Sequence, residues 1–207
     1  MSNRSIHTLL KNWDEECPLT REEAVEVLNL PEEEMDSLME CAYALRTKYK
    51  GKKVSVQLLT NVRSGNCTQN CAYCAQSKDS QAEIEKYKRV SDEKLYGDND
   101  LVDEKHLARH CIGLSGIGFS DEEIEDLADR IREMKKKDTQ ICCSIGFLTE
   151  KQARILKDAG LDRINHNLNS SRSFYPEICT THTYDQRVNL SLIHISKPTR
   201  RVVISYA

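Results

Sequence analysis

The residues best suited to chemistry are three cysteines with the spacing Cys67-x-x-x-Cys71-x-x-Cys74. A structural zinc site normally has four ligands, usually in two separated pairs, and ferredoxin-type clusters also take four cysteines. Three thiolates on a 4Fe–4S cluster leave one iron open to a small molecule, as a catalytic centre requires. The alternative is a structural zinc site completed by Cys111 or Cys142. We expect the iron–sulfur cluster because this spacing does not pair the ligands as zinc sites do.

The same spacing, with an aromatic residue just before the last cysteine, resembles the radical S-adenosylmethionine (SAM) superfamily. The resemblance implies that SAM chelates the open iron through its amino and carboxylate groups. It further implies that reduction releases a 5′-deoxyadenosyl radical, which abstracts hydrogen from an unactivated carbon. Tyr73 would then lie near the adenine. The alternative for this ring is simple packing under the loop.

Longer segments are similar to the biotin synthase family. In order, they are SGNCTQNCAYCAQS, RHCIGLSG, ICCSIGFLTEKQARILKDAGLDRINHNLNSS and ICTTHTYDQRV. The resemblance implies insertion of sulfur into dethiobiotin, with the sulfur drawn from a 2Fe–2S cluster that three cysteines and an arginine hold. Two of those cysteines correspond to Cys111 and Cys142, although free cysteine is also commonly a small buried residue. The alternatives are a radical SAM maturase, a paralogue with another substrate, or a non-catalytic iron–sulfur or zinc protein.

Asn165, Asn167 and Asn169 alternate along a segment expected to be extended, so they share one face. The family resemblance implies that Asn167 and Asn169 contact SAM and that Asn165 and Asn167 contact the substrate. Amides suit this role because they both donate and accept hydrogen bonds. Asn169 stands where many family members have aspartate. Alternatively, all three are turn residues.

The remaining candidates are expected to support the structure. His166 points away from the asparagine face and is expected to be a core histidine. Cys143 alternates to the opposite face of its strand. Arg109 matches an arginine in some family members, but a solvated side chain is the simpler interpretation. Three further cysteines carry no pattern that suggests chemistry: Cys17, Cys41 and Cys179.

After residue 53, expected strands alternate with expected helices. The strands are 53–62, 110–114, 141–147 and 161–167, and the helices begin at the capping residues Ser120 and Thr149. Alternation of this kind favours parallel βα units, whose active-site groups lie at the carboxyl ends of the strands. The predicted fold is therefore α/β, about half of a TIM-type radical SAM barrel. We expect no regular helix in the acidic stretch 96–105, because Gly97 and Asn99 interrupt it.

Three segments are expected: an N-terminal helical extension (1–52), the partial barrel (53–190) and a tail unrelated to the family (191–207). The first contains a capping-box pattern at Thr20 and Glu23, Pro31 at the start of a second helix, and Gly51 at its end. The tail, SLIHISKPTRRVVISYA, resembles translated sequencing adaptor and is not expected to continue the preceding helix. We therefore expect the natural protein to continue past residue 190 and this chain alone to be inactive towards dethiobiotin.

Composition excludes several classes of protein. The chain has 207 residues and a formal net charge of -3, which gives no basic surface for nucleic acid. No stretch approaches the ~20 apolar residues of a membrane span, and the N-terminus lacks a secretory pattern. Nine cysteines, an odd number, fit a disulfide framework poorly. We expect a cytoplasmic protein, for which the resemblance implies an electron donor such as flavodoxin or ferredoxin and a possible homodimer.

Overall fold

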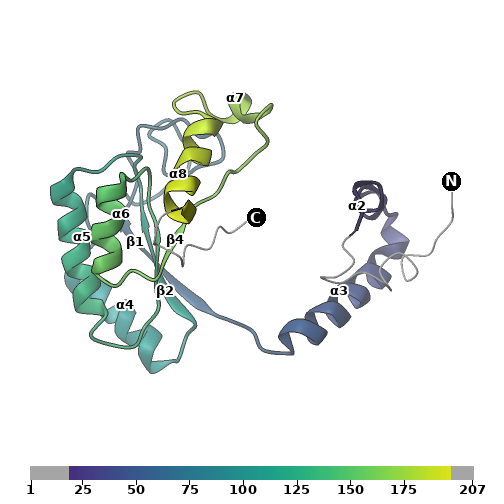
Figure 1. The fold of residues 1–207 in the computed structure, drawn as a ribbon, viewed down its shortest axis with the longest axis horizontal. Coiled ribbons are helices and arrows are strands. Elements are labelled where there is room, and N and C mark those ends of the chain that lie inside the picture. The colour runs from purple at the N-terminus through teal and green to yellow at the C-terminus, as the bar shows by residue number, and fades with distance from the viewer. Residues whose placement is uncertain (1–18, 197–207) are drawn as a thin grey trace. The chain divides into compact units, whose positions relative to one another are not determined.

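The computed structural model describes residues 19–196 and contains two compact units, Met1–Val54 and Ser55–Ala207 (Figure 1). The first unit is helical: α2 spans Arg21–Leu28, a 3-10 turn spans Glu32–Glu34 and α3 spans Met35–Lys50. The predicted capping box is confirmed, with Thr20 Oγ1 accepting from the Glu23 amide at 3.2 Å. None of these three elements contains a buried residue. Pro31 precedes the 3-10 turn instead of beginning the long helix.

The second unit is a parallel sheet of four strands in the order β1-β2-β3-β4, which confirms the α/β prediction. The strands are Gln57–Arg63, Arg109–Leu114, Ile141–Ser144 and Arg163–Asn165. Helices α4 (Asp92–Glu104), α5 (Asp121–Met134) and α6 (Glu150–Asp158) connect them and lie together on one side of the sheet (Figure 1). We call this covered side the outer face and the opposite side the inner face.

Three strands are shorter than expected. β1 begins at Gln57 instead of residue 53. β3 ends at Ser144 instead of residue 147, because the chain turns there towards the loop that follows β2. In that turn, the Phe147 amide donates to the Ile117 carbonyl at 2.6 Å, so Phe147 leaves the strand ladder. β4 keeps only three residues of the seven expected.

Helix α4 contradicts our prediction for residues 96–105. Ser91 caps the helix by accepting from the Lys94 amide at 3.2 Å. Leu95, Asn99 and Val102 are buried on one helical face, and the Asn99 side chain donates to the Met134 carbonyl at 3.2 Å. Buried contacts at helical spacing therefore outweigh the weak helix propensity of glycine and asparagine.

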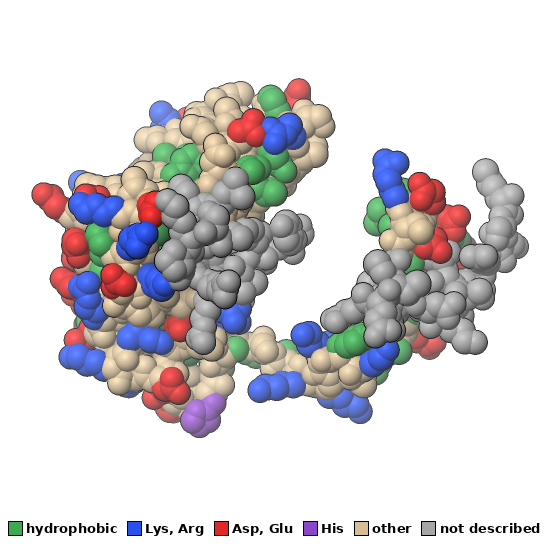
Figure 2. All heavy atoms as spheres, viewed as in Figure 1, with side chains coloured by type: hydrophobic (Ala, Val, Ile, Leu, Met, Phe, Trp, Pro, Cys, Tyr) green, Lys and Arg blue, Asp and Glu red, His purple; other side chains and the backbone are tan. Residues whose placement is uncertain are grey.

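Apolar side chains fill the space between the outer face and the helices. Cys143 is fully buried there, as the alternation along β3 predicts. The central residues of this core are Ile112, Ile124, Leu127, Ile131, Ile141, Leu156 and Ile164. The opposite sides of the helices are charged, and Figure 2 shows acidic and basic side chains interspersed over this surface. Exposed ion pairs such as Lys151–Asp121 contribute little to stability individually.

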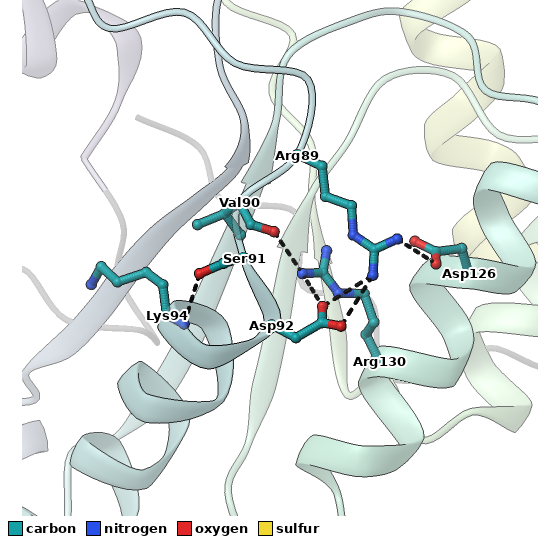
Figure 3. Close-up of polar contacts among 7 residues, drawn as sticks. All are labelled: Arg89, Val90, Ser91, Asp92, Lys94, Asp126 and Arg130. Carbon is teal, nitrogen blue, oxygen red and sulfur yellow. Dashed lines mark hydrogen bonds and ion pairs between the residues drawn. The ribbon is translucent and has the colours of Figure 1, made fainter.

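A polar network joins the start of α4 to α5 (Figure 3). Asp92 lies between two guanidinium groups, 3.0 Å from Arg89 and 2.6 Å from Arg130. Arg89 also reaches Asp126 on α5 at 2.8 Å, and the buried Arg130 donates to the Val90 carbonyl at 3.0 Å. The hydrogen bond from Arg89 lowers the pKa of Asp92, with Arg130 adding to the effect. This network fixes the direction in which α4 leaves the preceding loop.

At the C-terminal end, α7 spans Tyr175–Ile178 and α8 spans Tyr184–Ser196. Our expectation that the helix stops near residue 190 is wrong, because α8 continues for six residues beyond Leu190. These residues include no glycine or proline, and the first helix-breaking residue is Pro198. The rest of the expected tail, 197–207, and Cys17 lie outside the described residues. Within 19–196, every helix is too short or too polar to cross a bilayer.

Candidate functional site

A cavity of about 310 Å³ lies on the inner face at the carboxyl ends of the strands. Its floor is a row of residues that pair with one another across the four strands. In strand order, they are Asn61, Gly113, Ser144 and Asn165. Gly113 and Ser144 have little or no side chain, so few side-chain atoms fill the cavity above the centre of this row. A polar floor at this end of a parallel sheet is a typical position for an active site.

The loop after β1 brings Cys67, Cys71 and Cys74 to the wall of this cavity. The loop is closed by backbone hydrogen bonds from the Cys67 amide to the Gln76 carbonyl (3.0 Å) and from the Lys78 amide to the Cys67 carbonyl (2.9 Å). A tight turn joins the other two cysteines, because the Cys74 amide donates to the Cys71 carbonyl at 3.0 Å. All three thiols are free, so each is available to a metal.

A distant segment fixes the tip of the cysteine loop. The Asn70 side-chain oxygen accepts from the amides of Thr180 (3.0 Å) and Thr181 (3.2 Å), while its amide nitrogen donates to the Thr180 hydroxyl at 2.6 Å. The Ala72 amide donates to the Ile178 carbonyl at 2.9 Å. Sequence reasoning singled out the TTHTYDQRV segment as similar to the family but did not predict this contact.

The same segment places Cys179 against Cys71, with their sulfur atoms 3.7 Å apart. Burial, with the neighbouring Cys179 thiol, raises the pKa of Cys71 to about 11. The thiolate that a metal requires is therefore unfavourable in the empty loop and becomes favourable only with a cation present. Cys179, for which the sequence shows no pattern, is buried in a small core cluster with Cys71 and Tyr175.

Tyr73 also lines the cavity, and its side chain is 56% exposed. A ring that only packed under the loop would be buried, so this exposure favours the ligand-binding interpretation over the packing one. Partial desolvation, with the nearby Cys71 thiol, raises the pKa of Tyr73, which keeps the phenol neutral. The ring thus presents an uncharged aromatic surface to the cavity.

Asn165, Asn167 and Asn169 all line the cavity. The side-chain oxygen of Asn167 is buried and has no hydrogen-bond partner among the described residues. A buried acceptor without a partner is costly, so this oxygen is suited to a ligand's donor. Asn169 has a φ of 67°, in the left-handed region that asparagine tolerates.

Two neighbours hold the asparagine segment in place. His166 is buried, and its Nε2 lies 2.9 Å from the Arg187 carbonyl, consistent with the supporting role predicted for it. Arg187 donates from Nη1 to the Asn167 carbonyl at 3.1 Å. Sequence reasoning missed Arg187, which lines the cavity and connects α8 to the asparagine segment.

Cys111 and Cys142 lie on the inner face as register partners on β2 and β3. They are one row below the cavity floor, two residues before Gly113 and Ser144 in their strands. Cys111 Sγ lies 3.3 Å from the side-chain oxygen of Gln57. Arg109 is half-buried and its Nε has no partner in the described part of the chain, so this side chain is only partly solvated.

A hydrogen bond from Cys142 lowers the pKa of Cys111 to about 7, with the charge of Arg109 acting in the same direction. We therefore expect iodoacetamide to alkylate Cys111 of the cluster-free chain with a midpoint near pH 7, since the thiolate forms as pH rises through the pKa. Peptide mapping over a pH series measures this. Arg109→Gln should raise the midpoint. Alkylation midpoints that are equal for Cys111 and Cys142, near the ordinary thiol pKa of 9.0, would contradict the expectation.

The donors at the cavity fit a 4Fe–4S cluster with SAM. Three residues with free thiols line one space, and Asn167, which carries the unpartnered acceptor, lines the same space. Cys67, Cys71 and Cys74 would hold the cluster, which leaves one iron for the ligand. The polar row on the floor and the exposed ring of Tyr73 then remain available to the organic part of the cofactor.

The sequence model of the radical SAM superfamily matches residues 61–191, and the chain belongs to this superfamily. Its family implies a 4Fe–4S cluster and SAM. The chain is 41% identical over 171 residues to biotin synthase of Geobacillus kaustophilus, covering 82% of this chain and 51% of the relative. It is also 41% identical over 172 residues to biotin synthase of Bacillus subtilis, covering 83% and 51%. The chain thus spans about half the length of the curated relatives that it matches.

Solved structures show the same fold at lower identity. Methylornithine synthase superposes with a TM-score of 0.75 and 16% identity, covering 89% of this chain and 53% of that one. The FeFe-hydrogenase maturase of Carboxydothermus hydrogenoformans superposes with a TM-score of 0.76 and 20% identity, covering 91% and 44%. The four-stranded unit therefore corresponds to about half of a radical SAM barrel.

Proposed function

We propose that this chain is the SAM-binding half of an enzyme that inserts sulfur into dethiobiotin to give biotin. The observation that carries the proposal is the pair Cys111 and Cys142, in register one row below the cavity floor. Two adjacent thiols there can hold part of a 2Fe–2S cluster, while Cys67, Cys71 and Cys74 hold the 4Fe–4S cluster above. The identity to biotin synthases supports the same assignment.

Different residues of the chain are assigned to SAM and to the substrate. Tyr73, Asn167 and Asn169 bind SAM, while Asn165 and Asn167 bind dethiobiotin, whose ureido group offers donors and acceptors to amides. When bound, SAM and the reduced 4Fe–4S cluster supply the radical that removes hydrogen from the substrate. Arg187 and His166 hold the asparagine segment against α8. A flavodoxin or ferredoxin as electron donor and a homodimeric assembly belong to the same proposal.

The experiment is anaerobic reconstitution of the 207-residue chain with iron and sulfide, followed by reduction and addition of SAM. We expect SAM to change the paramagnetic signal of the reduced cluster and dethiobiotin to change it further by binding beside SAM, with no biotin formed by this chain alone. Asn165→Ala should lose the response to dethiobiotin and keep the response to SAM. Asp79→Ala, on the loop outside the cavity lining, is the matched control.

Two outcomes would reject parts of the proposal. A signal that responds to SAM but ignores dethiobiotin would leave a radical SAM enzyme with another substrate. A cluster signal that does not respond to SAM would favour a non-catalytic iron–sulfur protein.

A further inference from the structure

Cys71, Cys179 and His182 form a second cluster of potential metal ligands beside the cavity. Their ligand atoms all lie within 4.8 Å of one another, and no other three cysteine, histidine or acidic residues in the described chain do so. The two sulfur atoms are 3.7 Å apart, and Cys179 Sγ is 3.3 Å from His182 Nδ1. All three residues are buried, with exposures of 8%, 3% and 5%. The loop after β1 contributes Cys71, and the segment after α7 contributes the other two.

The Cys71–Cys179 and Cys179–His182 separations are close to those on a single tetrahedral ion. With Zn–S bonds of about 2.3 Å and Zn–N bonds of about 2.0 Å, two sulfurs on one ion are about 3.8 Å apart, and sulfur and nitrogen about 3.5 Å apart. A disulfide, by contrast, needs about 2.05 Å between the sulfurs. Two thiolates and one imidazole are a donor set that zinc prefers.

The surroundings of His182 suit ligation through Nδ1. Its Nε2 lies 2.9 Å from the Tyr175 hydroxyl, whose oxygen can accept a hydrogen bond from the Nε2–H group when Nδ1 binds the metal. Arg187 Nε donates to the same hydroxyl at 2.7 Å, closer than its 3.2 Å to Nε2. Without metal, Nδ1 donates to Gln69 Oε1 at 2.9 Å, so zinc must displace this hydrogen bond and move the proton of the ring to Nε2. An oriented second ring nitrogen is the usual support for a ligating histidine.

We propose that the cluster-free chain binds one Zn²⁺ through Cys71, Cys179 and His182, with water in the fourth position. Binding releases the two thiol protons, so one Zn²⁺ replaces two H⁺ and the net charge of the site does not change. Because Cys71 is also a ligand of the proposed 4Fe–4S cluster, zinc and that cluster exclude each other. The mutual exclusion of zinc and the 4Fe–4S cluster rests on the proposed function, whereas the zinc site itself does not.

The test is a cobalt titration of the double variant Cys67→Ala/Cys74→Ala, in which Cys71 is the last cysteine of the triad. We expect one Co²⁺ per chain, with thiolate-to-cobalt charge-transfer absorption that Zn²⁺ abolishes by displacement. A further Cys179→Ala or His182→Ala substitution should weaken binding at least about 100-fold, beyond the loss typical of supporting residues. Cys41→Ser in the same background, on α3 in the other unit, is the matched control and should leave the titration unchanged. Loss of the signal with Cys111→Ala, and not with Cys179→Ala, would overturn the site.

A second measurement uses the unsubstituted chain, so that misfolding of a variant cannot decide the result. X-ray absorption of the zinc-loaded chain should give two sulfur ligands and two nitrogen or oxygen ligands. A shell of three or four sulfurs would place zinc on the loop triad and refute the proposal.

Mutual exclusion is tested by adding iron and sulfide to the zinc-loaded chain. The 4Fe–4S absorption should appear only after a chelator removes zinc. Stable binding of both would overturn the exclusion. Failure of the zinc-free chain to assemble any cluster would count against the proposed function and would leave the zinc site standing.

Discussion

Cys67→Ala is expected to abolish assembly of the 4Fe–4S cluster. The thiol of Cys67 lines the cavity with those of Cys71 and Cys74, and alanine offers no ligand in its place. With two thiolates left, two irons of the cubane lack protein ligands, so the cluster should not survive removal of excess iron. Iron and sulfide analysis after desalting, with the visible absorption of the cluster, measures the loss.

Cys41→Ser is the matched control for this experiment. Cys41 lies on α3 in the other unit and should not affect the iron content. If the Cys67→Ala chain kept its cluster, another thiol would have to replace Cys67, and Cys179 is placed to do so because it lies 3.7 Å from Cys71. That result would remove Cys67 from the ligand set.

Gly146→Ala is expected to destabilise the second unit by about 3 kcal/mol, since the new methyl group overpacks a close backbone contact. An added Cβ would lie 2.5 Å from both Cα and the carbonyl oxygen of Ile117. Backbone atoms there cannot move aside as a flexible side chain can, and the Phe147 amide donates to the same carbonyl at 2.6 Å. Thermal unfolding should show a melting temperature lower by roughly 6–12 °C for a domain of this size.

Gly118→Ala tests whether the effect is specific to that contact. Gly118 lies on the same stretch of chain as Ile117, yet an added Cβ there would meet nothing within 4 Å. Its free energy of unfolding should change by less than about 1 kcal/mol. Equal destabilisation by both substitutions would show that loss of glycine flexibility, rather than the approach of Gly146 to Ile117, sets the cost.

Local signals in the sequence predicted the elements that depend on local contacts. The capping boxes at Ser120 and Thr149 are present in the structure, with both reciprocal hydrogen bonds formed. We did not predict helix α4 because its buried face includes Asn99, which is a weak helix former. Asn99 stabilises the helix through a hydrogen bond from its side chain to the Met134 carbonyl. That bond joins residues 35 positions apart, so no local pattern encodes it.

The sequence also predicted only part of the candidate site, because contacts between distant residues leave no local pattern. The cysteine spacing identified the loop, and strand alternation put Cys143 in the core. The contact between Cys71 and Cys179 joins positions separated by 108 residues, and the sequence offered no pattern for Cys179. Only the folded chain shows that Asn70 holds the two segments together through Thr180 and Thr181.

The register of the sheet also fixes a distance within the proposed enzyme. Cys111 and Cys142 lie two residues before Gly113 and Ser144, and a parallel strand rises about 3.3 Å per residue, so the two rows are about 6.6 Å apart. The pitch of a β-strand, more than any single side chain, therefore sets how far the floor of the cavity lies from the thiols that the proposed 2Fe–2S cluster would use.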